Sequence, residues 1–411
     1  MTARQARFRY LLLLALRWFP VGLGFPVLVL LPLDRGLTLA QVGLAASVQG
    51  FVVLLLELPT GGLSDSWGRR PVLVLSAAVS AVSLTLLAFA DTFAMFAVVY
   101  LLQGVYRALD SGPLQAWYVD ATLAADPSAK LERGLSTGDT VLSLSIGAAA
   151  LASSGIVAWV RIPGIPALVL PVLLGLVVQL IGLAVLAVLV TEPTRPRGTL
   201  TASIRQVPRV IAGGARVVRR SPILLCLLGV ELCWGFGMIT FEKLLPVRLS
   251  ELVGGPEKAA ELTGPASSAA WLVSALGAAL VPLLTARWGV GVTAVLLRVL
   301  HGVTVVGMGL LAGPVGALVG YLACYLVHGA ANPVHDTLLH REVTGEHRTT
   351  VLSLNSMVAQ PAGSLGLIAL TALASGVSTS FAIVVGAVVL ALAAPLYLPA
   401  VRAERRESLP V

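Results

Sequence analysis

The chain has 411 residues, of which 57% are hydrophobic and only 12% are charged. Ordinary soluble domains carry roughly 25% charged residues, and a soluble fold could not bury this much apolar surface, so the composition indicates an integral membrane protein. The net charge of +8 raises the alternative of nucleic-acid binding. The basic residues lie in short clusters between apolar runs, however, so we expect no nucleic-acid partner.

Apolar segments long enough to cross a bilayer recur along the chain. A spanning helix needs about 20 apolar residues. Twelve segments qualify in chain order: 10–32, 40–60, 71–90, 93–116, 135–158, 166–190, 222–246, 265–286, 291–312, 315–338, 350–374 and 380–401. The first resembles a secretion signal, but its apolar stretch runs on to Pro32 without a small-residue cleavage site, so we take it as a retained span.

The distribution of Lys and Arg orients these spans. If both termini are cytoplasmic, twenty of the 28 basic residues fall in cytoplasmic segments, four in exterior segments and four inside spans. This bias follows the positive-inside rule. We therefore predict a multi-pass protein of the cell (plasma) membrane, with both termini in the cytoplasm, whose basic loops lie against membrane lipid.

The longest connection divides the chain into two halves. It covers residues 191–221, after an N-terminal six-helix bundle over 1–190 and before a C-terminal bundle over 222–411. Residues 63–68, after the second span, match 284–289, after the eighth, at nearly the offset that separates Pro113 from Pro333. Such matches indicate an internal duplication, which is typical of transporters.

The loop after the second span carries a motif. It reads Gly61-Gly62-Leu63-Ser64-Asp65-Ser66-Trp67-Gly68-Arg69-Arg70-Pro71. Glycines permit a tight turn, and Arg side chains can bind a carboxylate bidentately. Asp120, at the cytoplasmic end of the fourth span, is the nearest candidate partner by topology.

This motif, between spans two and three of a twelve-span chain, resembles the signature of the major facilitator superfamily. The resemblance implies an all-α fold of two pseudo-symmetric six-helix bundles. It also implies that the loop latches the halves together on the cytoplasmic side, through Gly62, Asp65, Gly68, Arg69, Arg70 and Asp120. Residues 56–61 and 104–113 look like the drug:proton antiporter branch of the superfamily.

Charged residues inside spans are costly, so each is a functional candidate. The resemblance implies that spans one, four, seven and ten line the central cavity. Glu231 is the best candidate for proton coupling, because it lies inside its span with no basic residue at i±3 or i±4, and desolvation favours its neutral form. Arg107 and Asp110 share a helix face and are expected to pair. Glu57, near the cytoplasmic mouth, could relay protons.

Other cavity residues are candidates for substrate binding. Arg17 could bind an anion, pair with an acidic neighbour or snorkel to the membrane surface, of which we favour snorkelling. The remaining candidates in spans four, seven and ten are Tyr106, Trp234, Phe236, Phe241, His328 and Asn332. We interpret Arg298, His301, His335 and Asp336 as structural.

Two transport functions fit these observations. The first is proton-coupled efflux of small hydrophobic compounds or drugs by alternating access. The alternative is an importer, either a symporter or a uniporter, of a small metabolite, for which an anion could be bound by Arg17 and Arg107. No catalytic motif indicates an enzyme. The cysteines lack the spacing of metal ligands, so we expect no bound metal. We also expect no cofactor. As a transporter, the protein is expected to be a monomer whose partners are protons and a small-molecule substrate.

Overall fold

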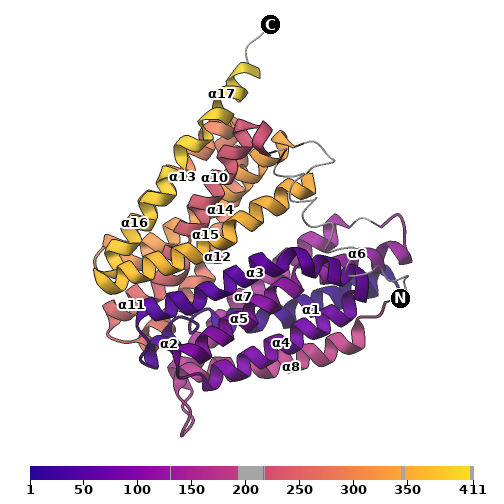
Figure 1. Ribbon diagram of the computed structural model, residues 1–411, viewed down its shortest axis with the longest axis vertical. Coiled ribbons are helices and arrows are strands. Elements are labelled where there is room, and N and C mark those ends of the chain that lie inside the picture. The colour runs from indigo at the N-terminus through magenta and orange to yellow at the C-terminus, as the bar shows by residue number, and fades with distance from the viewer. Residues whose placement is uncertain (130, 193–215, 217, 344–347, 408–411) are drawn as a thin grey trace. The chain divides into compact units, whose positions relative to one another are not determined.

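The computed structural model describes all residues except 130, 193–215, 217, 344–347 and 408–411. The side chains of a few further helical residues, among them Gly62 and Asp65, also lie outside the described part. Every regular secondary-structure element in the described residues is a helix, and these residues contain no β-strand (Figure 1). Most of the predicted linker, 191–221, falls among the residues that are not described.

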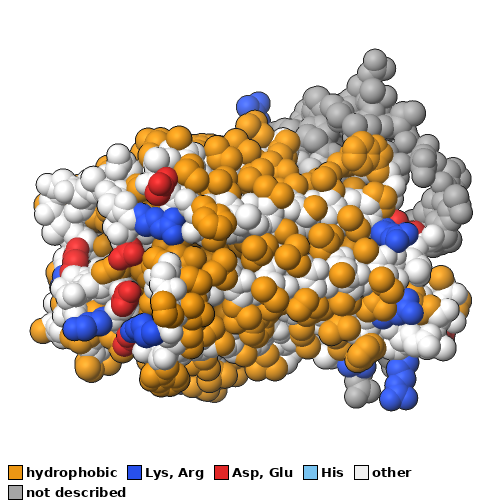
Figure 2. All heavy atoms as spheres, turned by 90° about the horizontal axis from the view of Figure 1, so that it is seen from below, with side chains coloured by type: hydrophobic (Ala, Val, Ile, Leu, Met, Phe, Trp, Pro, Cys, Tyr) orange, Lys and Arg blue, Asp and Glu red, His pale blue; other side chains and the backbone are white. Residues whose placement is uncertain are grey.

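Eleven of the described helical segments are long and apolar enough to cross a membrane. The remaining predicted span, 10–32, corresponds to two helices, α1 (Ala3–Gly24) and α2 (Leu30–Asp34), separated by a turn. Figure 2 shows hydrophobic side chains over most of the visible face, with Lys, Arg, Asp and Glu gathered away from its middle. A lipid-facing surface requires this distribution, because charged groups are costly in hydrocarbon.

The first compact unit comprises residues 1–37, 51–207 and 256–268. Its main helices are α3 (Leu39–Trp67), α4 (Arg69–Phe89), α5 (Phe93–Asp110), α6 (Pro113–Ala125), α7 (Glu132–Trp159) and α8 (Leu170–Leu189), with a 3₁₀ turn, η1 (Ala167–Val169). Helix α1 packs against α7 and α8, and α4 packs against α5 and α8. The rings of Tyr10 and Tyr118 stack with centroids 4.4 Å apart inside this unit.

The second unit comprises residues 38–50, 208–255 and 269–411. Its elements are α10 (Pro222–Gly237), η2 (Thr240–Leu244), α11 (Leu245–Val253), α12 (Pro256–Trp288), α13 (Val290–Leu310), α14 (Gly313–Glu342), α15 (Arg348–Gly376), α16 (Thr379–Leu392), η3 (Ala394–Tyr397) and α17 (Leu398–Glu407). Helices α3 and α12 are each divided between the units. The residues of α3 up to Gly50 belong to the second unit, and the residues of α12 up to Ser268 belong to the first.

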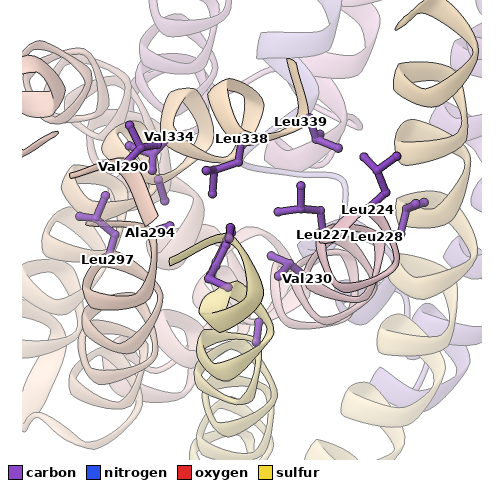
Figure 3. Packing of buried hydrophobic residues seen from close by; sticks show 14 of the residues in the cluster. Leu224, Leu227, Leu228, Val230, Val290, Ala294, Leu297, Val334, Leu338 and Leu339 are labelled. Atoms are coloured by element: carbon purple, nitrogen blue, oxygen red, sulfur yellow. The ribbon is translucent and has the colours of Figure 1, made fainter. Parts of the chain in front are cut away.

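A hydrophobic core joins three helices of the second unit. Leu227 and Val230 of α10, Leu297 of α13 and Leu338 of α14 belong to one cluster of buried residues (Figure 3). Glycine allows the close approach of α13 and α14, because a Cβ on Gly320 would lie 2.8 Å from the carbonyl carbon of Gly307 and nearer still to Met308. This packing sets the positions of the polar side chains that the same helices carry.

Two predicted spans are broken rather than continuous. Span four divides into α5 and α6 at Ser111 and Gly112, and Gly112 takes a left-handed backbone conformation with φ 96°. Span seven contains the π-helical turn η2 between α10 and α11. Helix breaks leave backbone groups that other parts of the protein must satisfy, and π-turns are frequent at functional sites.

Candidate functional site

Four elements of the second unit bring ionisable side chains together in its interior. Arg298 of α13 is 2% exposed, and its Nη2 donates to the hydroxyl of Tyr397 in η3 at 3.3 Å. That hydroxyl also lies 2.9 Å from Nδ1 of His335 on α14. On its other side, Nε2 of His335 lies 3.8 Å from the carboxylate of Glu231 on α10. We call Glu231, Arg298, His335 and Tyr397 the buried network.

The buried network gives Glu231 neighbours that its own helix lacks. Glu231 has no basic residue one turn away on α10, yet in space His335 of α14 lies beside its carboxylate. The reason is tertiary, because one hydrophobic core contains residues of α10, α13 and α14. Arg298 and His335, which we interpreted as structural, therefore lie in the same network as the proton-coupling candidate, and their roles stay predictions.

The same helices and the π-turn η2 carry a layer of packed rings. Phe241, held in the π-turn η2, packs against His301 at 5.4 Å and against His328 at 5.6 Å between ring centroids. His301 and His328 approach to 5.7 Å, and the ring of Trp234 lies nearly parallel to that of His328 at 5.9 Å. Three of the predicted substrate-binding residues thus meet in one layer.

Tyr325 and Tyr321 continue this layer along α14. Tyr325 meets Phe241 edge-on at 5.6 Å and lies 5.7 Å from His328. Tyr321 packs against Tyr325 at 4.8 Å. The predicted residue Phe236 is half-buried, and no ring contact joins it to this layer within the described part of the chain.

Helix α14 carries a polar face that continues from the ring layer. His328, Asn332, Asp336 and His340 follow one another at four-residue intervals, so they share one side of the helix. The amide of Asn332 lies 3.2 Å from Nε2 of His328. Asn332, Asp336 and His340 are exposed, whereas neighbours on the other side such as Val334 are buried. An exposed carboxylate within an apolar span indicates contact with water rather than with lipid.

The first unit holds a separate buried ion pair. Arg17 of α1 contacts the carboxylate of Asp110 at the end of α5, and the two side chains are 16% and 9% exposed. Arg17 also donates to the main-chain oxygen of Asp110 at 3.0 Å. The positive charge therefore stabilises the carboxyl end of α5, where the helix breaks and leaves carbonyl groups without helical partners.

This pair contradicts two expectations. Arg17 does not snorkel to the membrane surface, because its guanidinium forms an ion pair with the carboxylate of Asp110. Arg107 does not pair with Asp110 either, since Arg107 is exposed while Asp110 turns inward toward α1. Arg107 instead acts electrostatically on the half-buried carboxylate of Glu57, whose Oε2 has no hydrogen-bond partner among the described atoms.

A small cavity of about 20 Å³ adjoins the ion pair. Its polar lining includes Arg17, Asp110, Tyr106 and Gln179. The amide of Gln179 donates to the main-chain oxygen of Ala77 at 3.1 Å, which ties α8 to α4. A space of this size accommodates about one water molecule, so this cavity is too small for an organic solute.

The motif after span two forms a corner that is fixed by carboxylates. Gly68 joins α3 to α4 with φ 94°, and the main-chain N–H groups of Arg69 and Arg70 donate to the carboxylate of Glu192 at 2.9 and 3.0 Å. The side chain of Arg69 contacts Asp120 at 2.7 Å, so the partner chosen from topology does lie beside it. The latch function itself stays a prediction.

The second unit repeats this corner. Gly289 joins α12 to α13 with φ 78°, and the N–H groups of Val290 and Gly291 donate to the carboxylate of Glu404 at 3.1 and 2.9 Å. Arg341 also contacts Glu404, at 3.4 Å. A glycine corner and a carboxylate from a later part of the chain thus recur in both units, as expected for an internal duplication.

Sequence reasoning missed several of these residues. Glu192, Glu404 and Tyr397 were not considered, although a carboxylate placed equivalently after the last span of each half was a usable signal. Asp139 was also missed, and it lies exposed on α7 within the fifth span. No set of three or more His, Cys, Asp or Glu side chains that could hold a metal ion occurs in the residues the structure describes.

An all-helical fold of apolar spans that enclose buried charged groups defines a multi-pass membrane protein. The family model of the Major Facilitator Superfamily matches residues 10–366, and the chain belongs to this superfamily.

The same fold occurs in solved structures. The crystal structure of the nucleoside transporter NupG, as its D323A mutant, matches with a TM-score of 0.76 and 14% sequence identity, covering 96% of this chain and 99% of that one. A second NupG crystal structure matches with a TM-score of 0.75 and 14% identity, covering 96% and 98%. No curated protein sequence matches the chain.

Proposed function

We propose that this transporter is a proton-coupled importer of a small polar solute, working by alternating access between its two six-helix bundles. The observation that carries the proposal is the buried network, in which a carboxyl group, a guanidinium and an imidazole meet inside apolar spans. Such groups persist in a membrane interior only at a cost, and a carboxyl group that gains and loses a proton there is what proton coupling requires.

The residues around the buried network favour a polar solute over a hydrophobic drug. Trp234, His328 and Asn332 offer rings together with hydrogen-bonding atoms, and the polar face of α14 leads away from them. The two solved structures reported above are of a nucleoside transporter. At 14% identity they carry the fold alone, so nucleosides enter as one class of solute to be tested.

Proton-coupled efflux is the second candidate. The motif around Gly68 and the sequence of span four resemble the drug:proton antiporter branch, and Glu57 and Asp110 supply further carboxylates in the first unit. In either direction we propose a plasma-membrane protein with cytoplasmic termini that acts as a monomer. The direction of proton movement separates the two candidates.

The test uses the full chain in proteoliposomes. We expect an inwardly directed proton gradient to drive accumulation of at least one labelled solute from a panel of nucleosides, organic anions and neutral antibiotics. Glu231→Gln should abolish this accumulation while retaining solute counterflow, because exchange needs no proton transfer. Glu257→Gln is the matched control, since Glu257 is exposed in the first turn of α12. Unimpaired accumulation by Glu231→Gln would exclude Glu231 as the coupling residue.

A further inference from the structure

The second unit concentrates buried polar atoms that lack partners. Among the described residues, thirteen buried side-chain nitrogen and oxygen atoms have no hydrogen-bond partner, and seven of them lie in the buried network and its ring layer. They belong to Trp234, Arg298, His301, His328 and His335. Buried polar groups are normally satisfied, so this concentration requires an explanation in terms of a ligand.

Arg298 and His301 form the floor of this group. They lie three residues apart on α13 and therefore on one face of the helix. Arg298 is 2% exposed and leaves Nε and Nη1 without partners, and His301 is fully buried with both ring nitrogens unsatisfied. No carboxylate lies within 4.0 Å of Arg298 in the part of the chain that the structure describes. A buried cation without a close counter-ion is strongly unfavourable.

The missing partner is an acceptor that carries negative charge. Arg298 and Trp234 can only donate hydrogen bonds, and each neutral imidazole supplies one donor. Donors therefore dominate the unsatisfied set, and one of them carries a full positive charge. A carboxylate satisfies such a set better than a neutral carbonyl group, because charge-assisted hydrogen bonds are roughly twice as strong as neutral ones.

We propose that Arg298 and His301 form a binding subsite for the carboxylate group of the transported solute, which is therefore a small organic anion. This inference rests on the proposed transport function and names its substrate class. Binding has to displace neighbouring side chains, because Arg298 and His301 are 2% and 0% exposed.

The subsite couples solute binding to the proton. Arg298 is linked to Glu231 of α10 through the hydroxyl of Tyr397 in η3 and the ring of His335 on α14. The other titratable groups around it are Cys233 of α10, His301 of its own helix and His328 of α14. Asp336 of α14 is the second carboxylate that acts on Glu231. When Glu231 is ionised it competes with the solute for Arg298, and when it takes up a proton the guanidinium is left to the solute. Linkage then requires that protonation tighten anion binding and that the anion favour protonation.

The experiment measures binding to the purified full chain by thermal stabilisation and titration. The probes are benzoate and lactate, each paired with its neutral amide, and the neutral nucleoside uridine, at pH 5.5 and pH 7.5. We expect at least one carboxylate to stabilise the protein while its amide does not, and its Kd to be lower at pH 5.5. Arg298→Gln should weaken binding at least about tenfold, as loss of a charge-assisted hydrogen bond does.

Three variants keep the proposal falsifiable. His301→Gln should weaken carboxylate binding even if Arg298→Gln does not fold, and Arg298→Lys should retain part of it. Glu231→Gln should bind the carboxylate with the same Kd at both pH values. Equal binding of acid and amide, binding of uridine alone, or no binding by either carboxylate would overturn the subsite. Proton-driven uptake of uridine without carboxylate binding would leave the proposed function standing and refute only this inference.

Discussion

The ion pair between Arg17 and Asp110 yields a prediction whose size can be worked out from the structure. Both side chains are mostly buried, at 16% and 9% exposure. Removing one partner of a buried pair costs about 3–5 kcal/mol, because the other charge is left without compensation. Arg17 keeps its 3.0 Å hydrogen bond to the main-chain oxygen of Asp110 and borders a polar cavity. The lower end, about 3 kcal/mol, is therefore expected for Asp110→Asn.

The assay is thermal unfolding in detergent, followed by tryptophan fluorescence. A loss of about 3 kcal/mol corresponds to a fall in Tm of roughly 6–12 °C for a unit of about 200 residues. Arg17→Met should cost a similar amount, and the double variant Arg17→Met with Asp110→Leu should recover most of the loss, since apolar replacement of a buried pair is often neutral. Arg107→Gln is the matched control and should shift Tm little, because Arg107 is exposed.

Two results would refute this reasoning. One is a fall in Tm for Arg107→Gln as large as that for Asp110→Asn, which would restore the pairing expected within one helix. The other is additivity of the two single substitutions to within about 0.5 kcal/mol, since residues in direct contact show a larger coupling energy.

Three further predictions concern other parts of the structure. Glu404→Gln should destabilise the second unit by about 1 kcal/mol, as loss of a helix cap does, and Glu404→Asp should show whether the carboxylate alone suffices; an unchanged Tm for Glu404→Gln would mean that the cap contributes nothing. Gly320→Val should lower the free energy of unfolding by at least about 1–3 kcal/mol, because the larger side chain forces α13 away from α14. Gly376→Ala should be neutral, because Gly376 has open space around it. Equal effects of the two substitutions on Tm would contradict the close approach of α13 and α14. In a cysteine-free background, Asp336→Cys should react with a membrane-impermeant maleimide and Leu300→Cys, an exposed leucine on α13, should not; the reverse pattern would place lipid on the polar face of α14.

Much of the fold could be predicted from the sequence, because the length of an apolar run is enough to identify a membrane span. Each of the twelve predicted segments corresponds to one or more helices. The breaks in spans four and seven were not predicted, since Gly and Pro are common in membrane helices and do not by themselves mark a break. The role of Gly112 in the break becomes clear only in the structure, where it follows Asp110, the residue that contacts Arg17.

The candidate site was predicted in part. Spacing along one helix identifies neighbours at i±3 and i±4, and for that reason it paired Arg107 with Asp110 and found no partner for Glu231. The actual neighbours of these carboxylates, Arg17 for Asp110 and His335 for Glu231, come from other helices. Which side chains become neighbours across helices depends on how the helices pack in pairs, and this packing cannot be read from the residue spacing along one helix.

The central claim is that a solute and a proton enter together through a step that depends on Glu231. The most direct measurement is proton movement in proteoliposomes, followed with an external pH-sensitive dye after a solute is added to the outside. The account predicts alkalinisation of the external medium when a transported solute is added, and none with Glu231→Gln. Acidification by a solute would indicate antiport and efflux, and solute uptake without any proton movement would contradict proton coupling altogether.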